Sequence, residues 1–178
     1  MSESLLEHLT PELWQTETSA SQHCRREARR LGDTPPARAL IATAEHADAA
    51  MAEMRNLEVV QAGAKPGLGM LVGKLFSDVR ESVADRMLTS ERSYRGTLIG
   101  MRHGVDLVKL MLESARHERR ETLVQFFERW LQRREPLVEA AANELRWFAE
   151  RPEEALATAK GLGSTKARSE GEHEHPAS

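Results

Sequence analysis

Cysteine, aromatic residues and long hydrophobic runs are all scarce in this chain of 178 residues. Its single cysteine, Cys24, cannot form an intramolecular disulfide, so the fold does not depend on an oxidising compartment. No apolar run approaches the length of a membrane span. Residues 1–13 lack the basic and apolar regions of a signal peptide. We therefore expect a cytoplasmic protein that does not enter a membrane.

An excess of one charge is also missing. The formal net charge is −3, and charged residues of both signs are interspersed over 30% of the sequence. Such a chain is not a general binder of polyanions, and a nucleic-acid interface would need a local basic patch. The aromatic content of 4%, together with abundant Ala, Leu, Arg and Glu, favours helices over strands.

Apolar residues recur at helical spacing in four long segments. We expect these four amphipathic helices at residues 5–31, 35–60, 91–116 and 121–150. Ser4 and Glu7 have the spacing of a capping box before the first helix, and Gly32 is expected to end it. Pro136 lies inside the last helix and is expected to kink it.

The segments between and after these helices complete the predicted organisation. A glycine-rich break at residues 63–69 precedes a shorter amphipathic stretch at 70–86, which is expected to form a connecting helix. Residues 161–178 contain almost nothing to bury and are expected to form a disordered tail. The sequence thus predicts an all-α protein: a four-helix bundle of up-and-down topology in one domain, residues 1–160, with one additional short helix.

Two charged residues interrupt the apolar faces of the predicted helices. Glu17 follows Leu13 by four residues on the inner face of the first helix, and Arg134 precedes Leu137 by three on the inner face of the last. Unpaired charges are rarely buried. Since each residue lies near the middle of its helix, we expect a buried Glu17–Arg134 ion pair. Such a pair either forms a polar site inside the bundle or fixes the register of the helices.

Three glycines, Gly96, Gly100 and Gly104, repeat every four residues within one predicted helix. Each glycine in a helix interior costs about 1 kcal/mol relative to alanine, so we expect a compensating contact. A stripe of small residues lets another helix approach closely. The approaching helix belongs either to the same chain or to a second copy in a homodimer. A slot for a flat ligand is a further alternative.

Two groups of basic residues close two of the predicted helices. In an up-and-down arrangement both groups lie at one end of the bundle, where they would form an anion-binding patch for phosphate or RNA. The alternative is that these cations favour helix C-termini through the helix dipole. No aromatic residues are interleaved among them, so nucleic acid is not the favoured partner. The basic residues are Arg25, Arg26, Arg29 and Arg30 in the first group, and Arg116, Arg119 and Arg120 in the second.

The second predicted helix contains the stretch Ala-Glu-His-Ala-Asp at residues 44–48. This stretch and the helical layout resemble the ferritin-like superfamily over roughly residues 5–150. The resemblance implies a four-helix bundle. In di-iron members it also implies a glutamate from each of two helices and Glu-x-x-His pairs from the other two. Here Thr43 stands three residues before His46, and no Glu-x-x-His pair occurs in the bundle region. We therefore expect a member that lacks the intact di-iron ligands.

The leading functional hypothesis is a non-enzymatic helical-bundle protein that acts through a helix surface or a homo-oligomeric contact. A second hypothesis is a ferritin-like protein that binds metal or handles oxidation. A third is an anion or RNA binder that uses the basic end. No catalytic residue is assigned and no cofactor is favoured. If iron is bound, the candidate ligands are Glu17, His46, Glu91 and His103.

Overall fold

Helices make up most of the described chain. The computed structural model describes residues 4–57 and 88–158. The helices are α1 Leu5–Leu31, α2 Pro35–Met54, α5 Ser90–His117, α6 Glu121–Asn143, α7 Leu145–Ala149 and α8 Pro152–Leu156. These residues contain no strand, and Thr89 and Thr158 form an isolated β-bridge. The prediction of an all-α protein is confirmed for this part of the chain.

The ends of the first two helices follow signals in the sequence. The Ser4 hydroxyl accepts a hydrogen bond from the Glu7 N–H (3.2 Å), and the Glu7 carboxylate accepts one from the Ser4 N–H (3.0 Å). Gly32 ends α1 with a φ of +67°, a conformation that favours glycine. Thr34 then caps α2 by accepting a hydrogen bond from the N–H of Ala37. The short turn between the two caps folds α1 and α2 into a pair.

The last long helix is shorter than predicted. It ends at Asn143, and a separate short helix, α7, follows. It runs through Pro136, as the sequence predicts, and the expected kink stays a prediction. Pro136 lacks the N–H that would bond to the carbonyl of Gln132, and both residues are exposed, so water can hydrate that carbonyl instead. The helix tolerates this proline because the lost hydrogen bond lies on its solvent side.

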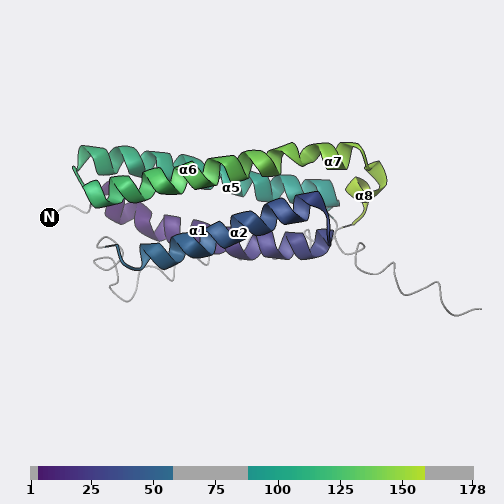
Figure 1. Ribbon diagram of the computed structural model, residues 1–178, viewed down its shortest axis with the longest axis horizontal. Helices are drawn as coiled ribbons and strands as arrows, with labels where there is room; N and C mark the ends of the chain where they lie inside the picture. The colour runs from purple at the N-terminus through teal and green to yellow at the C-terminus, as the bar shows by residue number, and fades with distance from the viewer. Residues whose placement is uncertain (1–3, 58–87, 159–178) are drawn as a thin grey trace, which may run out of the picture.

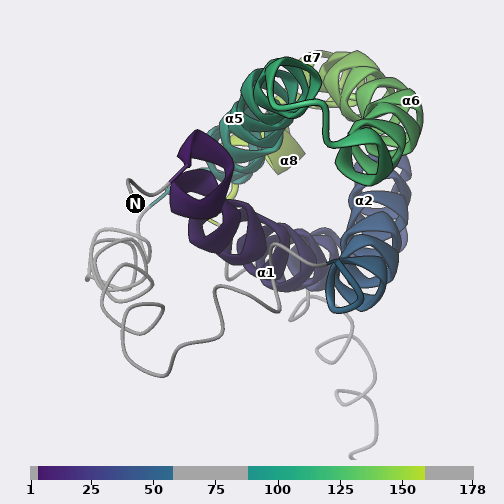
Figure 2. The same ribbon diagram turned by 90° about the vertical axis from the view of Figure 1, so that its left-hand side faces the viewer.

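The four long helices lie side by side along one axis (Figure 1). Viewed end-on, they form a ring in the order α1, α2, α6, α5 (Figure 2), and each packs against its two neighbours. Side-chain contacts give the helix directions. Ser93 Oγ donates to Glu27 Oε2 (2.7 Å), and His103 pairs with Glu12 (3.2 Å). Because α5 residues of rising number meet α1 residues of falling number, α1 and α5 are antiparallel.

The same reasoning shows that α2 and α6 are antiparallel, since His46 contacts Arg134 while Glu53 contacts Arg129. The α1–α2 and α5–α6 pairs are antiparallel too (Figure 1). It follows that α2 and α5 point in the same direction, so α2 ends and α5 begins at opposite ends of the ring. The simple up-and-down order that we expected is therefore wrong, because it would make α5 parallel to α1.

The apolar stripes of the helices meet in one core, which includes Tyr94, Phe127 and Trp130. Burying a large apolar side chain stabilises the fold by roughly 1.5–3 kcal/mol. Tyr94 donates a hydrogen bond from its hydroxyl to the carbonyl of Ala141 (2.8 Å), so its polar end is satisfied inside the core. Several polar residues are buried as well, namely Thr10, Glu17, Ser21, Glu27, Thr43, Ser90 and Arg134.

Within the described ranges, no helix has the length and apolar character needed to cross a bilayer. The connecting helix expected at residues 70–86 and the tail expected at 161–178 lie outside these ranges, as do residues 58–60 of the second predicted helix.

Candidate functional site

Glu17 and Arg134 meet in the middle of the core. Arg134 Nη2 donates to Glu17 Oε2 at 2.6 Å, and both side chains are fully buried. Glu17 comes from α1 and Arg134 from α6, which lie diagonally across the ring (Figure 2). The structure thus brings together the two charged residues that interrupt the apolar faces of their helices.

His46 and Trp130 complete this arrangement, which we call the Arg134 cluster (Glu17, His46, Trp130 and Arg134). Arg134 Nε donates to His46 Nδ1 at 2.9 Å. The guanidinium carbon of Arg134 lies 4.7 Å from the centre of the Trp130 ring, within the range of a cation–π interaction. The rings of His46 and Trp130 are 5.7 Å apart, edge to face. One guanidinium therefore organises side chains from three helices.

Sequence reasoning did not find the roles of His46 and Trp130. From the sequence alone, His46 is grouped with the candidate iron ligands and Trp130 is not singled out. A signal was present, because Trp130 precedes Arg134 by four residues and such pairs are neighbours on a helix surface. The contact between His46 and Arg134 depends on the adjacency of α2 and α6, which sequence spacing does not reveal.

Burial sets the charge states of the cluster. Burial raises the pKa of Glu17 to about 6, although the positive charge and hydrogen bond of Arg134 act in the opposite direction. The pKa of His46 is lowered to about 4, first by burial and then by the charges of Arg134 and Arg133. At neutral pH, Glu17 is mostly ionised and His46 is neutral. Because His46 Nδ1 accepts from Arg134, the imidazole proton is assigned to Nε2.

Three polar atoms of the cluster lack a hydrogen bond among the described residues: Glu17 Oε1, Trp130 Nε1 and Arg134 Nη1. The Trp130 N–H lowers the pKa of Glu17 from nearby, yet its geometry falls short of a hydrogen bond. Each buried unsatisfied group costs about 1–3 kcal/mol. The cluster therefore retains polar capacity in an otherwise apolar interior.

The candidate iron ligands do not converge. Glu91 accepts a hydrogen bond from Arg95 (2.7 Å) near the start of α5, and His103 pairs with Glu12 on the surface. Glu17 is the partner of Arg134, whose positive charge opposes a metal cation at that position. Among residues 4–57 and 88–158, no group of three or more His, Cys, Asp or Glu side chains is placed to hold a metal ion. The described residues thus do not fit a di-iron centre.

Within the predicted glycine stripe, Gly104 makes a close contact between α5 and α1. Gly104 is buried, and a Cβ there would lie 3.1 Å from Thr16 Cγ2 on α1. Gly100 is exposed, and a Cβ there would meet nothing within 4 Å, so no helix of the described chain makes the close contact expected at this position. Gly96 is half-buried in a cavity between α1 and α5.

The two basic groups do not form a common patch. Arg25, Arg26, Arg29 and Arg30 lie in the C-terminal part of α1, and Arg116, Arg119 and Arg120 lie at the C-terminal end of α5. Since α1 and α5 are antiparallel, these ends are at opposite ends of the ring, and the expected basic end is wrong. Acidic neighbours also pair with members of both groups: Arg25 with Asp48 (2.6 Å), and Arg116 with Glu128 (2.7 Å).

Comparison of the chain with protein-family models, curated proteins and solved structures gave no match.

Proposed function

We infer that this chain is a ferritin-like four-helix bundle that works without a metal, as a non-enzymatic protein that acts through contacts on its helix surfaces. The observation that carries this proposal is the position of Arg134. Its guanidinium lies in the core with Glu17 on one side and His46 on the other. A fixed positive charge thus lies between the carboxylate of Glu17 and the imidazole of His46, the two kinds of group that bind metal in di-iron bundles.

The directions of the helices support the ferritin-like part of the proposal. Bundles of the ferritin type have one long crossover connection, which joins a second and a third helix that point the same way. Here α2 and α5 point the same way, and α2 ends at the opposite end from the start of α5. A simple up-and-down bundle lacks this feature.

The Arg134 cluster then has a structural role. Buried ion pairs add little net stability, because the loss of hydration offsets most of the attraction, but they disfavour any helix register that leaves a charge unpaired. Glu17 and Arg134 belong to diagonal helices, so pairing them fixes the axial position of α1 against α6. The bundle is thereby held in one alignment, and its outer surface remains available for contacts.

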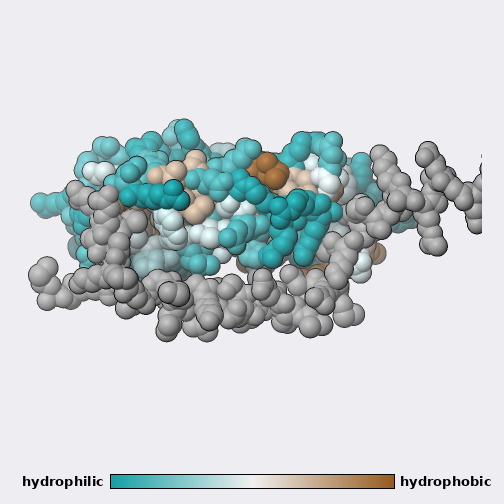
Figure 3. All heavy atoms as spheres, turned by 90° about the horizontal axis from the view of Figure 1, so that it is seen from below, coloured by the Kyte–Doolittle hydropathy of each residue, from teal (hydrophilic) through white to brown (hydrophobic). Residues whose placement is uncertain are grey.

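The outer face of α5 is the contact surface that this proposal favours. Ile99 and Leu110 are 65% and 48% exposed. They are separated by three helical turns, so they lie on the same side of α5. The described residues on the face drawn in Figure 3 are largely hydrophilic. A second copy of the chain is the proposed partner.

Light scattering tests this contact. We expect the full chain to be a dimer and Ile99→Glu to shift it towards monomer. Ile41→Glu is the matched control, because Ile41 is also exposed (37%) but lies on α2. A monomeric wild-type chain at high concentration would rule out self-association and leave a different protein as the partner.

Iron retention tests the absence of metal chemistry. The chain with His173→Gln and His175→Gln, which removes the histidines of the C-terminal segment, is incubated anaerobically with ferrous iron and desalted. We expect less than one tenth of an equivalent of iron per chain, an order-of-magnitude limit for a site whose carboxylate is held by a guanidinium. Retention of one or two equivalents would contradict the proposal.

A further inference from the structure

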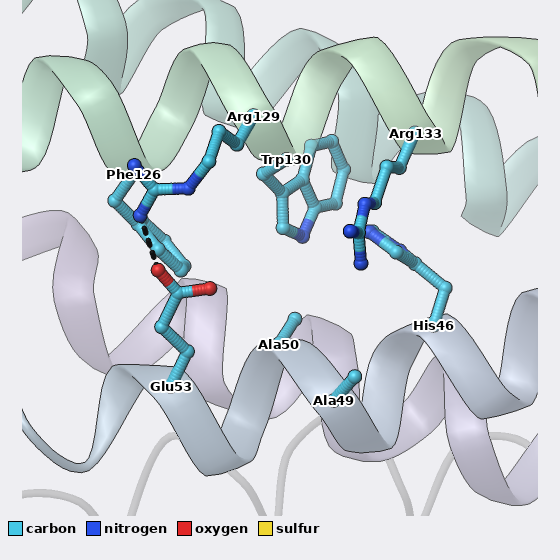
Figure 4. Close-up of a pocket in the computed structure, with 8 residues that line it drawn as sticks. All are labelled: His46, Ala49, Ala50, Glu53, Phe126, Arg129, Trp130 and Arg133. Carbon is cyan, nitrogen blue, oxygen red and sulfur yellow. Dashed lines mark hydrogen bonds and ion pairs between the residues drawn. The ribbon is translucent and has the colours of Figure 1, made fainter.

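A small pocket opens between α2 and α6, beside the Arg134 cluster (Figure 4). Its volume is about 90 Å³. This is the size of a small ion rather than of an organic cofactor. The lining residues are His46, Ala49, Ala50, Glu53, Phe126, Arg129, Trp130 and Arg133.

The charges around the pocket do not cancel. Glu53 and Arg129 form an ion pair across one side of the pocket, so their charges offset each other (Figure 4). Arg133 has no hydrogen-bond or ion-pair partner within the described ranges. It is exposed and close enough to His46 to lower its pKa. Among the described residues, Arg133 is thus a guanidinium without a carboxylate partner at the pocket, whereas the guanidinium of Arg134, which donates to His46, is paired with Glu17.

His46 adds a directed neutral donor. Its Nδ1 is fixed as the acceptor for Arg134, which assigns the ring proton to Nε2. Nε2 makes no hydrogen bond within the described residues. It is also not fully enclosed, unlike the buried unpaired atoms of Glu17, Trp130 and Arg134. The Arg134 contact thus orients the imidazole with an N–H available to a ligand. An anion is the ligand class that an N–H donor and a free guanidinium recognise together.

We propose that this pocket binds a small oxyanion of the phosphate or sulfate type, with the Arg133 guanidinium and the His46 Nε2–H as its hydrogen-bond donors. Trp130 forms an apolar wall of the pocket, and the Glu53–Arg129 pair borders the other side. The site is distinct from the basic helix ends, and it goes beyond the structural role proposed for the Arg134 cluster.

An NMR titration of the histidine ring signals tests this site in the full chain. Inorganic phosphate is added at pH 7 with the ionic strength held constant by sodium chloride, and the His46 signal is identified by its loss in His46→Gln. We expect a saturable shift of the His46 signal. Arg133→Gln should raise the apparent Kd by about tenfold or more, as expected for one charge-assisted hydrogen bond.

Arg102→Gln is the matched control, because Arg102 is exposed on α5, away from the pocket. It should change the Kd by no more than about twofold, as expected for a distant surface charge. A parallel titration with glycerol phosphate shows whether the site also accepts a phosphate group on a larger molecule, and saturation by either ligand supports the proposal. A linear, non-saturating response to both ligands would overturn it, and so would equal weakening by Arg133→Gln and Arg102→Gln.

Discussion

Replacing Arg134 with methionine removes the group that organises the cluster. Methionine keeps an unbranched side chain of similar reach but leaves Glu17 without its partner at 2.6 Å and His46 without its donor at 2.9 Å. Removing one member of a buried ion pair costs about 3–5 kcal/mol. For a chain of this size, that loss lowers Tm by roughly 6–20 °C.

The pH dependence of this loss follows from Glu17. In the wild type, the pKa of Glu17 is raised from 4.5 to about 6, so the folded state binds more protons than the unfolded state in this window. Stability from this group is present below pH 4.5 and is lost as the pH rises to about 6, by roughly 2 kcal/mol in total. Without Arg134 the pKa of Glu17 rises further, and the loss continues to higher pH.

In Arg134→Met at pH 7, Glu17 stays protonated in the folded state, which lowers the free energy of unfolding by roughly 3 kcal/mol relative to its value at low pH. In the wild type, where Glu17 ionises, the corresponding loss is roughly 2 kcal/mol. Arg134→Met should therefore be about 1 kcal/mol more destabilising at pH 7 than at pH 5 through this carboxyl group. Urea denaturation followed by circular dichroism at both pH values measures the difference.

Two further variants sharpen this test. Arg133→Met is the control, since the neighbouring arginine is exposed, and its effect should stay within about 0.5 kcal/mol. Glu17→Leu combined with Arg134→Met should recover most of the loss, because apolar replacement of a whole buried pair is often neutral or stabilising. A loss below about 1 kcal/mol for Arg134→Met alone would refute the reasoning, since it would mean that Glu17 does not depend on its partner.

Three other predictions concern single positions. Gly100→Ala should stabilise the protein by about 1 kcal/mol without changing its oligomeric state, because a Cβ there enters open space; a lower Tm would show a contact at this position. Gly104→Leu should destabilise it by about 1–3 kcal/mol, because the side chain would meet Thr16 and Trp130; an unchanged urea midpoint would contradict the close approach of α1. For His46, the pKa is lowered from 6.5 to about 4, so the folded state binds fewer protons than the unfolded state between these values. The free energy of unfolding of the wild type should therefore fall relative to that of His46→Gln as the pH decreases from 6.5 to 4. A constant difference between the two proteins in urea denaturation across that range would show that His46 is not buried.

Several features of the fold could be predicted from residues that are close in the sequence. The capping box of Ser4 and Glu7 and the turn glycine, Gly32, marked the first helix correctly, because these effects depend on residues within one turn of each other. Glu17 and Arg134 could be paired from the sequence because each stood out on an apolar face, and because a buried charge needs a partner.

Features that depend on helix direction could not be read from local patterns. The prediction of one basic end depends on an up-and-down order, and reversing α5 moves its C-terminal arginines to the other end. Pro136 lies inside its helix, and the cost of its missing N–H depends on whether the affected carbonyl faces water, which the position of a proline in the sequence does not reveal. Gly104 is buried against α1 and Gly100 is exposed, a difference that the regular spacing of the glycines does not reveal.

The most direct test of the metal-free Arg134 cluster is a titration of the full chain with Co²⁺ at pH 7, followed through the ring signals of His46. Arg134 donates to Nδ1 and its charge repels a cation, so the His46 signals should stay sharp while histidines outside the core broaden. The contradicting result is a paramagnetic shift or early loss of the His46 signals that disappears in the Glu17→Ala variant. It would show that Glu17 and His46 bind a metal ion together.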